Sequence, residues 1–398
     1  MTKEKTLPQP ANTLAMAGDN TYNENSGQQY LAMEACLPLF ESLSFDTLSY
    51  KVAYCLGNTS TIQFLNLWLL TPIIYKFLGA NATFVDYGCS QGAASMAVMQ
   101  RLVSQLPSNS TATLVFNDLP SNDFNSLIKL LPSIKAFDST KIIYPCIIPN
   151  SFYNPIMPQS TVDVAFALSS IHWLRQVPPP KSTSESLEDF LRKRDSRNSA
   201  ASHKDLIEFL NLRGREIKSG GKLIVASPSP CADNEDGRVT GNERLRCALF
   251  NAMESLIAVG KLPPNATAGI YPPNHIHTEQ SFRAAINETK RVWKIEKVYS
   301  QVIPHPAYQT MLESQKGLRD TELHKAFERA YANTVVDWIL AVFKPFMKSW
   351  WIKEGLNEEA CEQVFQECSS LAKIEFVKNA GAQLPVAQDF IFVRLNRY

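Results

Sequence analysis

The sequence has little net charge, because 39 lysine and arginine residues are matched by 38 aspartate and glutamate residues, giving a formal charge of +1. A balance this even provides no long-range attraction to nucleic acid or to an anionic membrane surface. Long apolar runs are also lacking: the most apolar stretch, residues 64–78, contains Asn66, Pro72 and Lys76 and is too short to span a bilayer. Residues 1–28 are polar and contain no apolar run of signal-peptide length. We therefore expect a cytoplasmic protein that binds neither nucleic acid nor membrane.

Cysteine clusters are missing as well, since the eight cysteines are scattered and none forms a C-x-x-C pair. Zinc sites and disulfide frameworks need clustered spacing, so we expect reduced thiols. His275 and His277 form an H-x-H pair, but no carboxylate or cysteine cluster accompanies them in the sequence. The sequence therefore predicts no metal site.

The pattern of apolar residues predicts an α/β fold. Short apolar runs predict strands over residues 82–87, 113–117, 162–168, 222–227 and 389–395. Apolar residues at three- and four-residue spacing predict helices over residues 30–43, 60–78, 93–106, 243–256 and 323–349. Strands alternating with helices are typical of a parallel sheet covered on both faces.

Two further segments complete the expected organisation. The proline-, serine- and charge-rich stretch 178–202 predicts an exposed insert or flexible loop. The chain beyond residue 228 is mostly helical in pattern, except for its final strand. We therefore expect an α/β domain formed by residues 1–228 and 385–398, with a helical cap formed by residues 229–384.

The turn Gly88–Gly92 lies between a predicted strand and a predicted helix. Its G-x-x-x-G spacing differs from the G-x-G-x-x-G pattern of dinucleotide sites, and it suits a nucleoside ligand with a methionine tail. Asp118 ends the next predicted strand, where a carboxylate can accept hydrogen bonds from both hydroxyls of a ribose. The alternatives are an ordinary strand–helix turn and an aspartate that caps the following helix.

Five motifs occur in an order that resembles the SABATH methyltransferases, the plant salicylate, jasmonate, indole-acetate and xanthine methyltransferases. They are Tyr22–Gln29, Asp86–Gly92, Phe116–Asn125 (FNDLPSNDFN), Ser151–Tyr153 and Ser169–Pro178 (SSIHWLRQVP). The resemblance covers residues 14–275 well, and within the family the chain is similar to fungal or microbial members. It implies a Rossmann-like class I methyltransferase sheet with a helical cap.

The resemblance also implies S-adenosylmethionine as cofactor and a small-molecule carboxylic acid, or in some members a ring nitrogen, as acceptor. The residues implied to line the cofactor are Tyr22, Ser26, Asp86, Gly88, Asp118, Leu119, Ser151 and Phe152. Gln29 and Trp173 match the pair that holds the acceptor carboxylate, with His172 and Tyr22 beside them. Ala93-Ala94 replaces the family's usual Pro-Asn, and Arg175 replaces its usual serine.

These residue types suit methyl transfer to a carboxylate, which is ionised at pH 7 and needs no general base. The Gln29 amide and the Trp173 indole offer N–H donors that can orient a carboxylate without neutralising it. The substrate hypothesis is a small aromatic acid. Arg246, in the predicted helix 243–256, would pair with a second carboxylate of a dicarboxylic acid; the alternative is that it faces water.

Three other functions stay open at this point. The same scaffold can carry an N- or phenol O-methyltransferase, or a non-catalytic relative that binds a ligand. A nicotinamide-dependent oxidoreductase is opposed by the missing G-x-G-x-x-G pattern. Trp350-Trp351 predicts either packing within the cap or a subunit contact, so a homodimer is a further alternative.

Overall fold

A computed structural model describes residues 27–41, 43, 80–176, 187–230, 241–270, 272–289, 291–379 and 381–398. The helix expected at residues 60–78 lies outside them. None of the described helices is long and apolar enough to cross a membrane. The strands are β1 (Asn81–Tyr87), β2 (Thr111–Asp118), β3 (Ile142–Pro149), β4 (Val162–Leu168), β5 (Ile217–Pro228), β6 (Trp293–Pro304) and β7 (Ala387–Arg397). The helices are α2 (Gly27–Cys36), α5 (Ala93–Ser104), α6 (Phe124–Leu130), α7 (Leu187–Glu216), α8 (Gly241–Ala258), α9 (Glu279–Glu288), α10 (Pro306–Gln315), α11 (Thr321–Lys353) and α12 (Glu358–Lys378), with short 3-10 turns η1 (Leu37–Phe40), η2 (Leu131–Ala136), η4 (Ala266–Ile270) and η5 (Gly381–Gln383).

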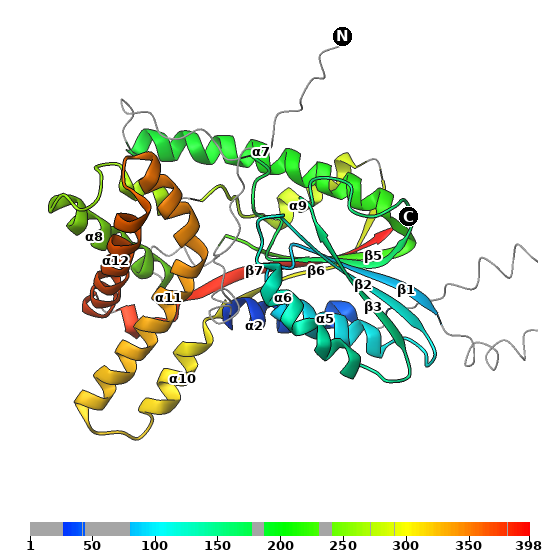
Figure 1. Cartoon of the computed structure of the whole chain (residues 1–398), viewed down its shortest axis with the longest axis horizontal. Helices are drawn as coiled ribbons and strands as arrows, with labels where there is room; N and C mark the ends of the chain where they lie inside the picture. The colour runs from blue at the N-terminus through cyan, green and yellow to red at the C-terminus, as the bar shows by residue number, and fades with distance from the viewer. Residues whose placement is uncertain are drawn as a thin grey trace, which may run out of the picture.

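The strands form one mixed sheet in the order β3-β2-β1-β4-β5-β7-β6 (Figure 1). The first five strands of this order pair in parallel, as the sequence predicts. β7 pairs antiparallel with both β5 and β6, so the sheet is not parallel throughout. Strand order reverses at β1, with β2 on one side and β4 on the other, and ligands of open α/β sheets bind at such a point.

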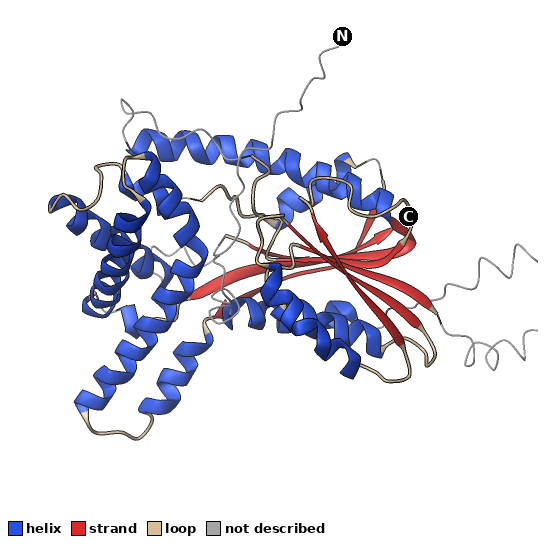
Figure 2. Cartoon of the chain, viewed as in Figure 1, coloured by secondary structure: helices blue, strands red, loops and turns tan. Residues whose placement is uncertain are grey.

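Alternate side chains of each central strand enter two separate cores. Phe84 and Phe392 pack on one face with α2, η1 and α5, whereas Val85 and Val393 pack on the other face with α7 and α9. Figure 2 shows these helices above and below the sheet. The apolar runs that predict the central strands thus reflect burial on both faces.

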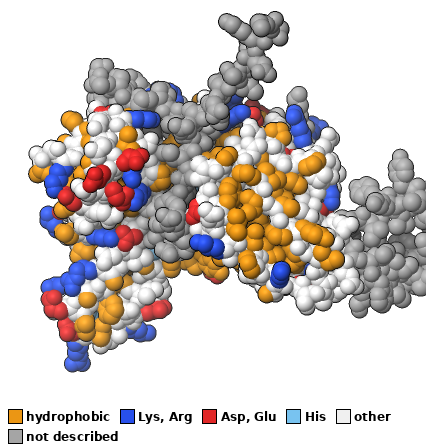
Figure 3. All heavy atoms as spheres, in the orientation of Figure 1, with side chains coloured by type: hydrophobic (Ala, Val, Ile, Leu, Met, Phe, Trp, Pro, Cys, Tyr) orange, Lys and Arg blue, Asp and Glu red, His pale blue; other side chains and the backbone are white. Residues whose placement is uncertain are grey.

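The two strands that the sequence pattern did not predict are the two edges of the sheet. β3 contains Pro145, which an edge strand tolerates, and Ile142 and Tyr144 are more than half exposed. Hydrophobic side chains gather on this part of the surface in Figure 3. β6 alternates apolar and charged residues and leaves most of its length partly or fully exposed. The mixed pattern of β6 explains its omission, whereas β3 (IIYPCIIP) is apolar throughout and was omitted despite that run.

The expectation of a loop over residues 178–202 is wrong for its described part, because residues 187–202 form the first half of α7. Polar side chains hold this half against residues 272–278. Asn198 donates from Nδ2 to the Asn274 carbonyl at 3.1 Å, and Ser202 Oγ lies 3.3 Å from His277 Nε2. A helix that packs through polar groups shows no apolar stripe in its sequence.

The cap has its own core, formed by α8, α11 and α12 with Trp351 fully buried. The predicted helices 243–256 and 323–349 correspond to α8 and α11. Trp350 and Trp351 donate their indole N–H groups to the carbonyls of Asn265 and Ala266, so both pack within the cap. β6 and α9 lie within residues 229–384 but pack with the sheet, so the expected cap boundary cuts across the observed packing.

Tyr331 of α11 joins the cap to the sheet, because its hydroxyl accepts a hydrogen bond from the Val386 N–H at 2.8 Å just before β7. Tyr331→Phe leaves that buried N–H unpaired, so we expect the free energy of unfolding to fall by about 1–3 kcal/mol. Urea denaturation measures the loss, with an unchanged slope. Tyr308→Phe removes an exposed hydroxyl that donates to Gln383 and serves as the control. Equal stability of both variants would contradict the role given to Tyr331.

Candidate functional site

The turn after β1 requires glycine at Gly88 for two reasons. Its φ of 90° lies in the left-handed region, and an added Cβ would lie 2.3 Å from the Ser170 Cβ. Ser170 also donates from Oγ to the Tyr87 carbonyl at 2.7 Å. The carboxyl ends of β1 and β4 therefore touch at this turn.

A pocket opens beside this turn at the carboxyl ends of the strands. It is lined by residues of α2, of the end of β1, of the start of α5 and of the turn after β4: Gln29, Asp86, Gly88, Cys89, Ser90, Gly92, Ala93, Ala94, Ser95, Leu168 and Ser169. Three residues that the sequence singles out, Gln29, Asp86 and Gly88, thus share one pocket. In the described parts of the chain, no group of three or more histidine, cysteine or acidic side chains could hold a metal ion.

Asp86 is a buried carboxylate with unused hydrogen-bonding capacity. It is 3% exposed, and its Oδ2 accepts from Ser95 Oγ at 2.5 Å. Its Oδ1 has no hydrogen-bond partner among the described residues. Burial raises the pKa of Asp86 to about 7, the negative charge of Asp118 adds to the rise, and the Ser95 hydroxyl opposes it. A cationic donor placed in the pocket would satisfy Oδ1.

Asp118 ends β2 and faces the glycine turn. Its Oδ2 accepts from the Ser90 N–H at 2.6 Å and its Oδ1 from the Leu119 N–H at 2.7 Å. Each oxygen keeps a lone pair, so the carboxylate can still accept from two neighbouring hydroxyls. Burial raises the pKa of Asp118 to about 6, and the two N–H groups limit that rise. Asp118 therefore lies beside the glycine turn, and its role as a ribose ligand stays a prediction.

Hydrogen bonds between side chains of the two motifs connect the glycine turn to the turn after β2. Asn122 donates from Nδ2 to the Ser90 carbonyl at 2.7 Å, and Gln91 reaches Asp123 at 3.4 Å. Asp123 also caps α6, accepting from the Ser126 N–H at 3.2 Å. The helix cap that the sequence allowed as an alternative role thus belongs to Asp123, not to Asp118.

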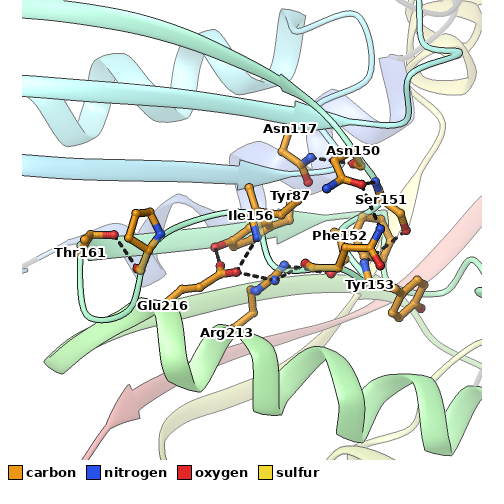
Figure 4. Close-up of polar contacts among 12 residues, drawn as sticks. Tyr87, Asn117, Asn150, Ser151, Phe152, Tyr153, Ile156, Thr161, Arg213 and Glu216 are labelled. Carbon is orange, nitrogen blue, oxygen red and sulfur yellow. Dashed lines mark hydrogen bonds and ion pairs between the residues drawn. The ribbon is translucent and has the colours of Figure 1, made fainter. Parts of the chain in front are cut away.

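The loop that follows β3 also borders the glycine turn. Asn117 of β2 donates from Nδ2 to the carbonyls of Ile148 and Asn150, which fixes the end of β3 and the start of the loop. Ser151 and Phe152 follow, and the Phe152 ring lies 3.7 Å from the position of a Cβ built on Gly88. Figure 4 shows Asn117, Asn150, Ser151 and Phe152 together at this loop.

A buried ion pair holds the same loop from below (Figure 4). Arg213, fully buried near the end of α7, donates to the carbonyls of Phe152 and Asn154, each at 3.0 Å, and to Glu216 Oε1 at 2.9 Å. Glu216 in turn accepts from the Tyr87 hydroxyl at 2.6 Å and from the Ile156 N–H at 2.7 Å. The pair thereby connects β1, the loop after β3 and α7.

The acceptor residues suggested by the sequence lie on α2 and on the turn after β4. Gln29 lines the pocket and accepts a hydrogen bond from Trp338. The Trp173 ring stacks on Phe346 with centroids 5.3 Å apart and planes at 14°, and the His172 ring lies 4.8 Å from it. Burial, with a smaller effect of His277, lowers the pKa of His172 to about 3, so His172 is neutral at pH 7.

Of the site residues proposed from the sequence, Gln29, Asp86 and Gly88 line the pocket, whereas the described residues outside its lining are Asp118, Leu119, Ser151, Phe152, His172, Trp173 and Arg246. Tyr22 and Ser26 lie outside the described residues. Arg246 lies on the surface of α8 with 62% of its side chain exposed, and it forms an ion pair with Glu243 at 3.7 Å. The structure therefore supports the alternative that the sequence left open, in which Arg246 faces water.

Several residues of the site were not identified from the sequence. Asn117 left a signal, since it is a polar residue at the end of the apolar run Thr113–Asn117. Ser95 gave a weaker one, as a hydroxyl in the first turn of the helix after the glycine turn. Arg213, Glu216 and Trp338 gave none, because they are distant in sequence from every motif and lie in ordinary helical patterns.

The double requirement for glycine at Gly88 can be tested against a glycine with only one of its two features. Gly220 also has a positive φ, of 79°, but an added Cβ there meets nothing within 4 Å. We expect Gly220→Ala to cost about 1–2 kcal/mol of unfolding free energy from backbone strain. Gly88→Ala should cost about 1–3 kcal/mol more, because its Cβ overlaps Ser170. Equal losses in urea denaturation would show that the contact with Ser170 relaxes freely.

Comparison with known proteins places this site in a family. A family model described as SAM dependent carboxyl methyltransferase matches residues 70–388. Methyltransferase LUC1 of Fusarium sp is 31% identical, with 97% of this chain and 98% of that protein covered. The O-methyltransferase acrG of Aspergillus aculeatus is 28% identical over the same shares of the two chains. These relatives confirm the similarity to fungal members.

Plant proteins match over shorter regions, and a solved structure matches over nearly the whole chain. Gibberellic acid methyltransferase 2 of Arabidopsis thaliana is 28% identical over 61% of this chain and 69% of that protein. A loganic acid methyltransferase with SAH superposes with a TM-score of 0.67 at 18% identity, covering 96% of this chain and 98% of that one. That likeness confirms the class I methyltransferase fold. The chain belongs to the family of S-adenosylmethionine-dependent carboxyl methyltransferases.

Proposed function

We propose that this methyltransferase esterifies the carboxylate of a small organic acid. The observation that carries the proposal is the environment of His172, which is buried beside Trp173 with its pKa lowered to about 3. A histidine with so low a pKa is a weak base and would deprotonate a phenol poorly. A carboxylate is already ionised at pH 7 and needs no base. The environment of His172 therefore favours an acid over a phenol as acceptor.

The pocket and the segments that border the glycine turn offer suitable contacts for the cofactor of the family. The free Oδ1 of Asp86 suits the ammonium group of the methionine part, and the remaining lone pairs of Asp118 suit the ribose hydroxyls. Phe152 supplies an aromatic ring beside Gly88. When bound, S-adenosylmethionine supplies an electrophilic methyl group on a sulfonium. The protein residues then have to orient the acceptor oxygen and exclude water.

Gln29 and Trp173 are the residues that we propose for orienting the acceptor. Both carry N–H donors, and neither carries a charge that would neutralise the carboxylate. Holding two reactants in a productive pose can lower the barrier by roughly 7–11 kcal/mol. Arg246 faces away from such a role, so the proposal includes no preference for a dicarboxylic acid. A cytoplasmic location also remains part of the proposal, and so does the homodimer as an alternative to the monomer.

The proposed reaction can be tested with matched acceptors. Wild-type protein with S-adenosylmethionine should convert one or more acids of an aromatic and aliphatic panel into products heavier by one CH2, detected by mass spectrometry. Phenols and primary amides built on the same skeletons should give no product, because they lack an ionised oxygen at pH 7. Alkaline hydrolysis of the product should return the acid, as expected of an ester. Methylation of the phenols with none of the acids would overturn the proposal.

The raised pKa of Asp86 predicts that cofactor affinity depends on pH. A cation beside Asp86 favours its ionised form, so binding below pH 7 must release a proton. Affinity for S-adenosylhomocysteine should therefore fall by about tenfold per pH unit below the pKa of about 7, and more steeply below 6, where Asp118 also takes up a proton. Asp86→Asn should remove the step near pH 7 and keep the one near pH 6.

Calorimetry in buffers of different ionisation enthalpy measures both the affinity and the proton release. The control is Asp138→Asn, which changes an aspartate in the turn before β3 that pairs with Lys141. Its pH profile should match that of the wild type. If the wild-type affinity for S-adenosylhomocysteine stays constant between pH 6 and 8, Asp86 does not contact the cofactor.

A further inference from the structure

Helix α11 of the cap contacts both residues proposed to orient the acceptor. Trp338 donates its indole N–H to Gln29 Oε1 at 3.0 Å. Eight positions along the same helix, and just after Pro345, the Phe346 ring stacks on Trp173. Gln29 and Trp173 come from α2 and from the turn after β4, two segments far apart in the sequence. One cap helix thus supports two separate parts of the acceptor site.

The bond from Trp338 determines which end of the Gln29 amide faces the pocket. An indole has one N–H donor and no acceptor, so the group that it contacts has to be the amide oxygen. The two N–H groups of Gln29 are then directed away from Trp338. Gln29 also lines the pocket, so we infer that these donors serve an acceptor bound there. Donors suit a carboxylate, whereas the amide oxygen would repel it.

The surroundings of Trp338 hold the indole in place. Trp338 is 9% exposed, and the His305 ring lies against it with centroids 5.4 Å apart. His305 is buried, accepts a hydrogen bond from the Ala307 N–H, and burial lowers its pKa to about 4. The histidine is therefore neutral at pH 7 and brings no positive charge near Gln29. Trp338 supplies the polar contact that orients the amide.

The backbone of Gln29 is held independently of Trp338. The neighbouring Gln28 is 1% exposed and donates from Nε2 to the Ile303 carbonyl of β6 at 2.8 Å. A Cβ on Gly27 would lie 3.2 Å from the ring of Pro306, so α2 packs closely on the start of α10. The position of α2 is thus fixed by β6 and α10. The Gln29 amide could still rotate about its side-chain bonds, and the hydrogen bond from the Trp338 indole N–H prevents this rotation.

We propose that Trp338 is a positioning residue that turns the N–H groups of Gln29 toward the acceptor and thereby sets the preference for an ionised acid. This inference rests on the proposed function. It assigns to the cap a second role besides shaping the pocket, because a residue of α11 determines the polarity of the pocket wall at Gln29.

The test is Trp338→Phe, which keeps a ring at this position and removes the N–H. We expect the KM for the acid to rise about fivefold to tenfold, the size of one lost hydrogen bond, with the KM for S-adenosylmethionine unchanged. Trp350→Phe is the matched control, since Trp350 lies on the same helix and donates to the carbonyl of Asn265 in the cap. It should leave both KM values unchanged.

Two further measurements separate positioning from a general loss of structure. In a Gln29→Leu background, Trp338→Phe should raise the acid KM no further, because it acts through Gln29. The primary amide of the acid serves as a competitive inhibitor. Without the bond from Trp338, Gln29 can turn its oxygen toward the NH2 group of this inhibitor. Trp338→Phe should therefore weaken binding of the amide less than binding of the acid. A merely structural effect would weaken both ligands alike.

The outcomes for the two proposals are distinct. If the wild type esterifies an acid but Trp338→Phe keeps its acid KM, or raises it equally with and without Gln29, the positioning role is overturned and the proposed function stands. If the wild type forms no ester with any acid, the proposed function fails, and the role of Trp338 fails with it.

Discussion

The buried pair of Arg213 and Glu216 is the interaction on which the cofactor side of the site depends. Burying two charges is costly, and the cost is offset only when hydrogen bonds satisfy both groups. Here carbonyls of the loop after β3 and the Tyr87 hydroxyl satisfy most of the pair's polar atoms, and Arg213 Nε alone of the guanidinium nitrogens has no partner among the described residues. Arg213 also lies over the Tyr87 ring, 4.1 Å from its centroid. Losing one partner of such a pair typically costs 3–5 kcal/mol.

The location of the pair explains its role, because it lies between two segments of the cofactor side of the site. Tyr87 comes directly between Asp86 and Gly88, so its hydroxyl anchors the strand end that carries the pocket carboxylate. The loop held by Arg213 carries Ser151 and Phe152 beside the same glycine turn. Because the pair lies beneath both segments, it fixes their separation from inside the fold. The end of β1 and the loop of Ser151 and Phe152 are thereby positioned by the protein itself, as a preorganised site requires.

Burial shifts the pKa values of three groups at the site in the direction that favours their neutral forms. Burial raises the pKa values of Asp86 and Asp118 and lowers that of His172. The two carboxylates therefore gain from the approach of a cation, whereas the histidine stays uncharged beside the acceptor. The cofactor carries a sulfonium and an ammonium group and is therefore suited to the two carboxylates. An ionised acid can lie beside the uncharged histidine.

The sequence predicted the centre of the sheet, and it named residues of the cofactor side whose roles stay predictions. The five central strands were predicted because burial on both faces gives them continuous apolar runs. β6 gave no such run and was omitted, while β3 (IIYPCIIP) was omitted although it is apolar throughout. The first half of α7 packs through Asn198 and Ser202, so its proline-, serine- and charge-rich composition was wrongly interpreted as a loop. At the site, residues within contiguous motifs such as Asp86 and Asp118 were identified. Trp338 and Arg213 were not, because their roles arise only when distant segments meet.

The order of the strands has a consequence for how the chain is made. β7 lies between β5 and β6 in the sheet, yet it follows both of them, and the whole cap, along the chain. β5 and β6 can therefore join one sheet only through β7, which is the last strand to be synthesised. The parallel half, with the glycine turn and Asp118, can assemble first. The strand that closes the sheet is also the one tied to the cap, because the Val386 N–H just before β7 is bonded to the Tyr331 hydroxyl of α11.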